Sequence, residues 1–433
     1  MFKTIIDAFK IKEVRRKILI TLLLLLIYRI GCWLPIPGIK PDVFRAEVAG
    51  QQNGFLGLLS TLSGGALSNA SILALGVSPY INASIIIQLL QVAIPRLDEI
   101  AKSGEDGRKK INFYTRMAAL ILAIAQAIGI TASLSGAGLF DVEGFWNGSI
   151  GFLAPIFTVI ILVAGAMFTV WLGERITQNG IGNGLSMLIF VGILSTTGAA
   201  LLGAVTSITK DISYLWNLII FLVAVILIFA FIVFIDNSER KIPVQYAKQI
   251  KGRKTYGGQS NCIPVRLNGS GVIPIIFASA LLSFPSMLCS IFWQDSMESV
   301  NAVIGPETPL YIILTAVLIL FFSYFYAQIS FNPEDISKRI QQGGGFINGI
   351  RPGRDTQDFL TKVSRRITLF GAIFLAFIAL VPSIIFNYVG GNLTGLSGAF
   401  GATSMMIVVS VALEFQKQLE AQMITRNYKG FLN

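Results

Sequence analysis

Apolar stretches of about 20 residues, the length that a helix needs to cross a bilayer, recur along the whole chain. Short polar segments and a few longer basic ones separate them. The pattern predicts ten membrane-spanning helices, over residues 18–36, 76–94, 117–135, 152–172, 184–204, 215–235, 272–292, 309–329, 367–386 and 396–416. We therefore expect an all-α polytopic membrane protein.

A shorter apolar piece precedes the second of these spans. Residues 65–75 are rich in Gly, Ser, Ala and Asn. As a helix they would extend only about 16 Å, at a rise of 1.5 Å per residue. The hydrocarbon core of a bilayer is about 30 Å thick. The sequence therefore predicts a half-length helix, whose place directly before a full span needs a reason other than crossing the membrane.

The positions of Lys and Arg predict the orientation of the spans. Thirty of the 34 basic residues lie in one alternating set of segments, residues 1–17, 95–116, 173–183, 237–271, 331–366 and 417–433. The opposite loops hold Lys40, Arg45 and Lys210, and Arg29 lies toward the outer end of the first span, where we expect it to snorkel to the surface. The positive-inside rule then places both termini and the two long basic loops, 237–271 and 331–366, in the cytoplasm.

The two halves of the chain show a weak internal repeat. The second span opens "GVSPYINAS" at Gly76 and the seventh opens "GVIPIIFAS" at Gly271, with six of nine positions identical. Five spans per half is an odd number, so residues 205–433 would run inverted relative to residues 1–204. Two Gly/Pro-interrupted spans at equivalent places predict the working site of such a protein.

Composition narrows the class of function. Of the 433 residues 54% are hydrophobic, 13% are charged and none is His, which excludes HExxH zinc sites and His-based catalytic triads. The three cysteines lack metal or disulfide spacing. We expect no catalytic residue, no metal and no cofactor. An intramembrane enzyme would also need a carboxylate pair inside the spans, and the sequence has none there.

The spans are nearly free of ionisable side chains. A secondary transporter of a small solute is the alternative from another class, but it would need ionisable groups near the membrane midplane. The side chains that could line a path are instead aliphatic, namely Val77, Ile81, Ile189 and Ile276. An apolar constriction blocks ions and water by dewetting but selects no substrate. Such a constriction suits a pore that opens for a large substrate of variable chemistry.

Two features of the sequence allow more than one function: the polar residues inside the spans, and the two long basic loops. Four polar residues could join helices by hydrogen bonds, worth about 0.6 kcal/mol each. They are Asn82 and Gln88 on the second span, Gln126 on the third and Asn268 before the seventh. They could also form a weak polar seam that opens sideways, but the sequence alone favours helix association. Each long basic loop holds seven Lys or Arg and could meet anionic lipid, RNA phosphates or an acidic protein surface.

Several long stretches, in order along essentially the whole chain, resemble the SecY family, the central subunits of bacterial protein-conducting channels. The stretches that carry this resemblance are "YRIGCWLPIPGI", "SGGALSNASILALGVSPYINASIIIQLL", "EDGRKKINFYTR", "WLGERITQNGIGNGLS", "GVIPIIFAS", "NPEDISKRIQQGGGFINGIRPG" and "FGATSMMIVV". The resemblance implies two inverted five-helix halves around a central hourglass pore. It also implies secretion of unfolded polypeptides and lateral insertion of membrane helices.

The resemblance assigns roles to particular residues. The half-length helix becomes a plug at about residues 60–75, with Gly64, Gly65, Ala66, Leu67, Ser68, Ala70 and Ile72. The pore ring falls on Val77, Ile81, Ile189, Ile276 and Ile407. The polar cluster of a lateral gate, between spans two–three and seven–eight, falls on Asn82, Gln126 and Asn268. The resemblance therefore favours a lateral gate, rather than simple helix association, as the role of these three residues.

The resemblance also implies partners and a location. The basic loops are expected to dock the ribosome and the SecA motor ATPase through Arg240, Lys241, Lys248, Arg253, Lys254 and Arg351. Small SecE-like and SecG-like membrane subunits, signal sequences, nascent polypeptides and membrane lipids are the other expected partners. The expected location is the bacterial plasma membrane, with the energy for transport supplied by SecA or the ribosome.

Overall fold

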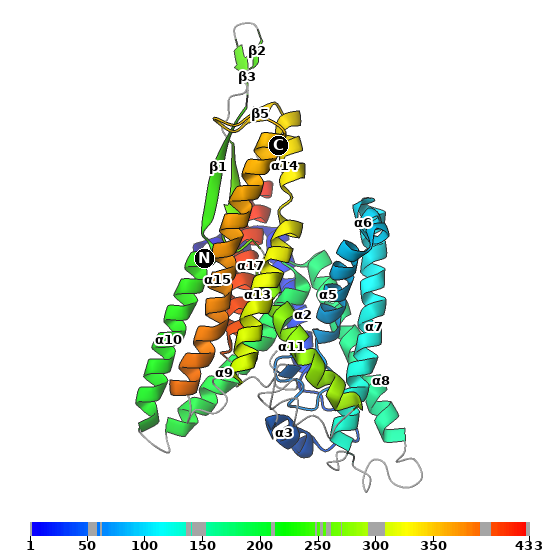
Figure 1. The fold of residues 1–433 in the computed structure, drawn as a ribbon. Helices are drawn as coiled ribbons and strands as arrows, with labels where there is room; N and C mark the ends of the chain where they lie inside the picture. Colours follow the sequence, from blue (N-terminus) through cyan, green and yellow to red (C-terminus); the bar gives the residue numbers. More distant parts are fainter. Residues whose placement is uncertain are drawn as a thin grey trace.

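The structure, a computed structural model, describes residues 2–50, 59–60, 63–135, 140, 153–208, 213–246, 249–251, 254–256, 261–269, 271–292, 308–389 and 400–429. Helices dominate it (Figure 1). The helices of the first half are α1 (Phe2–Lys10), α2 (Lys12–Gly31), α3 (Pro41–Gly50), α5 (Ser78–Ala93), α6 (Pro95–Lys102), α7 (Glu105–Ser135), α8 (Ala154–Asn179) and α9 (Gly184–Ile208). Those of the second half are α10 (Ser213–Asp236), α11 (Ile273–Phe292), α13 (Pro309–Ser330), α14 (Pro333–Gln342), α15 (Arg354–Val389) and α17 (Ala402–Lys429).

Each predicted span overlaps a helix, which confirms the all-helical, multi-pass fold. Six helical stretches in the described residues are long and apolar enough to cross a membrane, and α5 with α6 makes a seventh if that bent pair counts as one span. The axes of α5 and α6 differ by 106°. The bend follows from Pro95, because a proline forces the preceding residue, here Ile94, out of the helical region (φ −115°, ψ 105°). The count of ten membrane spans and the two inverted halves stay predictions.

The half-length helix at residues 65–75 is a wrong prediction. Residues 63–76, hereafter the turn segment, form successive turns with an isolated bridge at Ser71. Gly64, Gly65 and Gly76 have φ between 55° and 79°, and Ala70, at 49°, has the only positive φ among the described non-glycine residues. These left-handed residues interrupt the helix at three places, because the right-handed helix needs a negative φ throughout.

Helix packing brings distant parts of the chain together. In the first half α7 packs on α5 and α8, and in the second half α13 packs on α11 and α15. Contacts of α7 with α11 and of α9 with α17 join the two halves. The outward surfaces are apolar: on α10, Trp216, Ile226 and Phe234 are each more than 60% exposed. Such surfaces match a lipid environment.

The two long basic loops fold into one small sheet at one end of the bundle (Figure 1). Its strands are β1 (Glu239–Tyr246), β4 (Asn261–Arg266) and β5 (Gly345–Phe346), in the order β4-β1-β5 and antiparallel, with Gln245 opposite Phe346. A separate hairpin, β2 (Gln249–Lys251) with β3 (Lys254–Tyr256), extends beyond it. Apolar residues of both loops, including Val244 and Ile340, pack with Leu360 of α15. The two loops are therefore one structural unit.

Candidate functional site

All five predicted ring residues lie in one apolar cluster at the junction of the two halves, the apolar junction. Val77, Ile189 and Ile407 are buried in it, with exposed fractions of 2%, 6% and 3%, and Ile81 and Ile276 pack against it partly buried. The buried members of this junction are Leu25, Tyr28, Cys32, Ala66, Leu73, Val77, Leu172, Ile176, Met187, Leu188, Ile189, Ile193, Ile407 and Val411.

Four helices supply the five predicted ring residues, all near their first turns. Val77 is the N-cap of α5, and Ile81 follows one turn later with its N–H donating to the Val77 carbonyl (3.1 Å). Ile276 lies in the first turn of α11, Ile189 in the second turn of α9 and Ile407 in the second turn of α17. The repeated "GV" openings thus place Ile81 and Ile276 against the same cluster, as the internal repeat suggested.

The turn segment packs beside the predicted ring residues. Ala66 and Leu73 belong to the apolar junction, whereas Leu67, Ala70, Ala74 and Leu75 enter a second cluster formed with α7 and α8. Each of these six side chains is at most 2% exposed. Small residues make this close seating possible: a Cβ placed on Gly165 of α8 would lie 1.9 Å from the Ile72 carbonyl oxygen.

Main-chain hydrogen bonds also hold the turn segment. Ser71 pairs with Pro35 of the segment after α2 in an antiparallel bridge. On either side of the bridge the Ile36 N–H donates to the Ala70 carbonyl (2.9 Å) and the Ile72 N–H donates to the Leu34 carbonyl (3.0 Å). Of the other predicted plug residues, Ser68 shares a hydrogen bond with Ser60 (2.7 Å between hydroxyl oxygens).

The three predicted gate residues do not bond to one another in the part of the chain that the structure describes. Asn268 donates from Nδ2 to Oδ1 of Asp236 on α10 (3.0 Å). Gln126 is 1% exposed on α7, and neither end of its amide has a hydrogen-bond partner among the described residues. Asn82 is half-buried on α5. A single polar cluster of these three is therefore not formed by direct hydrogen bonds.

A different polar contact crosses from the first half to the second at the predicted gate. The Tyr326 hydroxyl of α13 donates to Oε1 of Gln88 on α5. Around it Phe277, Phe322 and Tyr326 form a buried aromatic cluster, and Ile85 and Leu89 of α5 pack against that cluster. Gln88 stood out in the sequence as a polar residue on an apolar span. Tyr326 carried no such signal, because aromatic residues abound in its span.

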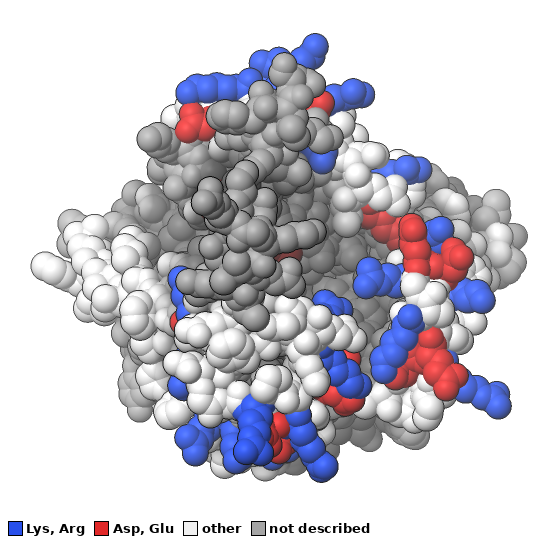
Figure 2. Space-filling model, turned by 90° about the horizontal axis from the view of Figure 1, so that it is seen from above, with Lys and Arg blue, Asp and Glu red and all other residues white. Residues whose placement is uncertain are grey.

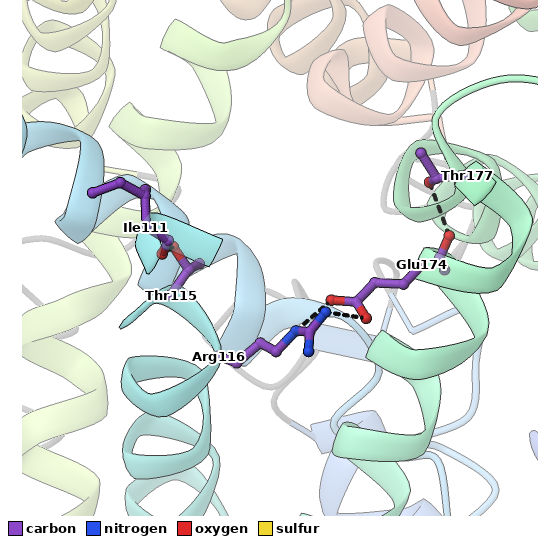
Figure 3. Close-up of polar contacts among 6 residues, drawn as sticks. Ile111, Thr115, Arg116, Glu174 and Thr177 are labelled. Atoms are coloured by element: carbon purple, nitrogen blue, oxygen red, sulfur yellow. Dashed lines mark hydrogen bonds and ion pairs between the residues drawn. The ribbon is translucent and has the colours of Figure 1, made fainter. Parts of the chain in front are cut away.

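An ion pair joins α7 to α8 within the first half (Figure 3). Nε and Nη2 of Arg116 donate to the two carboxylate oxygens of Glu174, both at 2.7 Å. The Arg116 side chain is 47% exposed and that of Glu174 is 22% exposed. Exposed pairs are worth about 0.2–1 kcal/mol. The two-point geometry therefore sets the orientation of α7 against α8 more than it adds stability.

The predicted docking cations are only partly described. Arg240 and Lys241 are exposed on β1, and Arg351 is exposed in the turn after β5, where the Thr356 hydroxyl donates to its carbonyl (2.8 Å). The antiparallel pairing of β1 with β5 brings the two loops that carry them into one sheet. The side chain of Lys254 on β3 lies outside the described residues, as do Lys248 and Arg253.

Figure 2 views the protein from the end that carries the sheet. Lys and Arg project around the rim of this face, with Asp and Glu interleaved among them. In the described residues no group of three or more Cys, Asp and Glu is placed to hold a metal ion. The described part of this end therefore presents a charged surface of mixed sign.

The helices, the apolar junction and the buried turn segment define a multi-pass, helical membrane protein built around an apolar cluster at the junction of its two halves. The family model for SecY matches residues 71–416. A protein translocase subunit SecY from Streptomyces galbus is 42% identical, with 98% of each chain covered. The chain belongs to the SecY family.

Solved structures share the fold at low sequence identity. One described as a protein-conducting channel superposes with a TM-score of 0.64 at 18% identity, covering 95% of this chain and 93% of that one. Sec61 from the canine ribosome–channel complex of the endoplasmic reticulum superposes with a TM-score of 0.62 at 17% identity, covering 95% and 93%. The shared fold therefore extends over nearly the whole chain.

Proposed function

We propose that this chain is a passive, gated channel for unfolded polypeptides in the bacterial plasma membrane. The observation that carries the proposal is the apolar junction, in which the five ring residues of α5, α9, α11 and α17 contact one cluster together with Ala66 and Leu73 of the turn segment. An aliphatic ring closed by a small-residue segment blocks ions and water, and it opens by displacement of packed side chains rather than by chemistry.

The turn segment is the plug in this proposal. It leaves the ring when a polypeptide enters and returns afterwards. The ring then closes around the passing chain, and its aliphatic side chains tolerate any sequence because they offer no hydrogen bonds that a substrate must satisfy. An engaged signal sequence shifts the closed–open equilibrium by binding the open state better.

The lateral gate lies between α5–α7 and α11–α13. The support for this position is the contact of α7 with α11, together with the aromatic cluster and the Gln88–Tyr326 hydrogen bond. Asn82, Gln126 and Asn268 act there as single polar residues, and buried Gln126, whose amide has no hydrogen-bond partner among the described residues, bonds an entering helix or water. Opening along this line releases apolar segments into the lipid.

The end that carries the sheet faces the cytoplasm in this proposal, with both termini on the same side. SecA or a translating ribosome docks on the sheet through Arg240, Lys241 and Arg351, and also through Lys248, Arg253 and Lys254. The energy for transport comes from those partners. SecE-like and SecG-like subunits cover part of the apolar outer surface of the bundle.

A reconstitution experiment tests the channel. Vesicles that hold this chain with its small subunits receive SecA, ATP and an unfolded precursor, and transport is measured as protection of the precursor from added protease. In chains with Ile81→Cys or Ile276→Cys, a stalled precursor should cross-link to the new cysteine. Ile226→Cys, which is 64% exposed on α10, is the control and should not cross-link. Cross-linking at Ile226 but not at the ring, or no protection at all, contradicts the proposal.

A further inference from the structure

Arg29 does not snorkel to the surface, so that sequence prediction is wrong. Its guanidinium turns inward from the last turns of α2 and is partly buried. Nη1 donates to the Gly64 carbonyl of the turn segment (3.1 Å), and Nη2 donates to the Ser195 hydroxyl of α9. One side chain therefore joins two helices to the turn segment.

The charge of Arg29 lacks a carboxylate partner among the described residues. The dipoles of one carbonyl and one hydroxyl compensate it instead. A partly buried cation is costly unless such groups solvate it, and hydrogen bonds to a charged group are about twice as strong as neutral ones. Arg29 and the turn segment thus stabilise each other in the closed arrangement.

The local backbone fits this contact closely. Gly64 has a φ of 69°, in the region that favours glycine. A Cβ at this position would lie 2.5 Å from Cα of Gly192 on α9 and 2.9 Å from Nη1 of Arg29. One residue earlier, the Tyr28 hydroxyl donates to the Ser63 carbonyl (3.2 Å). Consecutive side chains of α2 therefore hold consecutive carbonyls of the turn segment.

We infer that Arg29 is a positioning residue that latches the turn segment in the closed channel. This inference rests on the proposed function and adds the residue that sets how readily the plug leaves. The acceptor in the plug is a main-chain carbonyl, so the latch is independent of the plug's side chains. When the plug leaves, Arg29 loses the Gly64 carbonyl and keeps only Ser195 and the water that enters.

The first test measures the resting ion conductance of vesicles that hold the full chain with its small subunits. Arg29→Gln removes the charge and should raise the conductance at least about tenfold, the usual effect of losing a charge-assisted hydrogen bond. Ser195→Ala keeps the Gly64 contact and should raise it less. Arg45→Gln is the matched control: it makes the same charge change at an exposed position of α3 and should leave the conductance unchanged. If the Arg29→Gln channel has the same resting conductance as the wild type, the latch is refuted.

A disulfide that pins the turn segment separates a lost latch from general damage. Pro35 and Ser71 form a non-hydrogen-bonded antiparallel pair, because the hydrogen bonds flank them. Such pairs have Cα atoms about 4.5 Å apart, within the range of about 4.4–6.8 Å that a disulfide spans. Pro35→Cys with Ser71→Cys, in a chain whose native cysteines are serine, should therefore cross-link on oxidation.

The pinned channel gives an outcome that depends on the plug alone. When Arg29→Gln is combined with this pair, oxidation should return the conductance to the wild-type value and reduction should restore the leak. A leak that persists after oxidation overturns the inference, because the ions would then cross by a path that the turn segment does not close. Precursor transport by the wild type in the same vesicles tests the proposed function separately: a channel that transports precursor but is insensitive to Arg29→Gln refutes only the latch.

Discussion

The Gln88–Tyr326 contact gives a quantitative prediction for the gate. Tyr326 is 8% exposed, and its ring packs edge-on against Phe277 with centroids 5.3 Å apart. Tyr326→Phe keeps this packing and removes only the hydroxyl that bonds Gln88. Gln88 is half-buried and can still reach water when the gate opens. The substitution therefore removes one interaction of the closed state and leaves the open state unchanged.

The size of the effect follows from the kind of bond. Hydrogen bonds between membrane helices are worth about 0.6 kcal/mol on average, and a typical protein hydrogen bond is worth up to about 1.5 kcal/mol. The closed–open equilibrium should then shift about 3- to 10-fold toward the open state. A precursor with a weakened signal sequence depends on that equilibrium, so its transport should rise by the same factor. An intact precursor should gain little.

The assay compares transport of both precursors in reconstituted vesicles. Tyr324→Phe is the matched control, since Tyr324 lies on the same helix and makes no side-chain hydrogen bond to the described residues. Gln88→Leu should act like Tyr326→Phe, and the double variant should do no more than either. Fully additive effects of the two changes, or no gain with either, would refute the reasoning.

Three further predictions concern the plug and the docking surface. Deletion of residues 65–72 should raise the resting conductance well above that of the wild type, and an unchanged conductance in planar bilayers would argue against a plug. Gly165→Ala places a Cβ 1.9 Å from a main-chain carbonyl of the turn segment, so it should destabilise the closed channel by about 1–3 kcal/mol and cause a leak. Gly198→Ala, with open space around its Cβ, should do neither in the same measurements. Arg351→Glu should reduce SecA-driven export more than tenfold while the channel still assembles normally. Lys110→Glu is the control and should not reduce export. Equal export by both variants in a protease-protection assay would contradict the docking role.

The sequence predicted the helices well because membrane spans obey a simple rule. A backbone in lipid must satisfy its own hydrogen bonds, so long apolar runs become helices wherever they occur. Ile81 and Ile276 could also be singled out from the sequence, because the repeat around them marks two equivalent helix starts. Their shared cluster is what the structure adds.

The remaining features depend on contacts between distant residues. The turn segment looked helical because its apolar and small residues allow a helix, but tertiary contacts hold Gly64 and Ala70 at positive φ. Gln88 and Tyr326 are 238 residues apart, and no local pattern pairs them. The sheet is similar: β1 and β5 lie in loops without a clear strand pattern, and β5 becomes a strand only through its pairing with β1, which lies 99 residues earlier in the chain.

Helix α15 extends without interruption for 36 residues, from Arg354 beside the sheet to Val389. At 1.5 Å per residue this is a rod of about 54 Å, longer than the hydrocarbon core is thick. Its first turns pack on the apolar base of the sheet, and along its length it lies against α10, α13 and α17. In the proposed channel, one continuous helix would thus link the docking sheet to α13 at the proposed gate and to α17 at the proposed ring, so that a force applied to the sheet would reach both through α15.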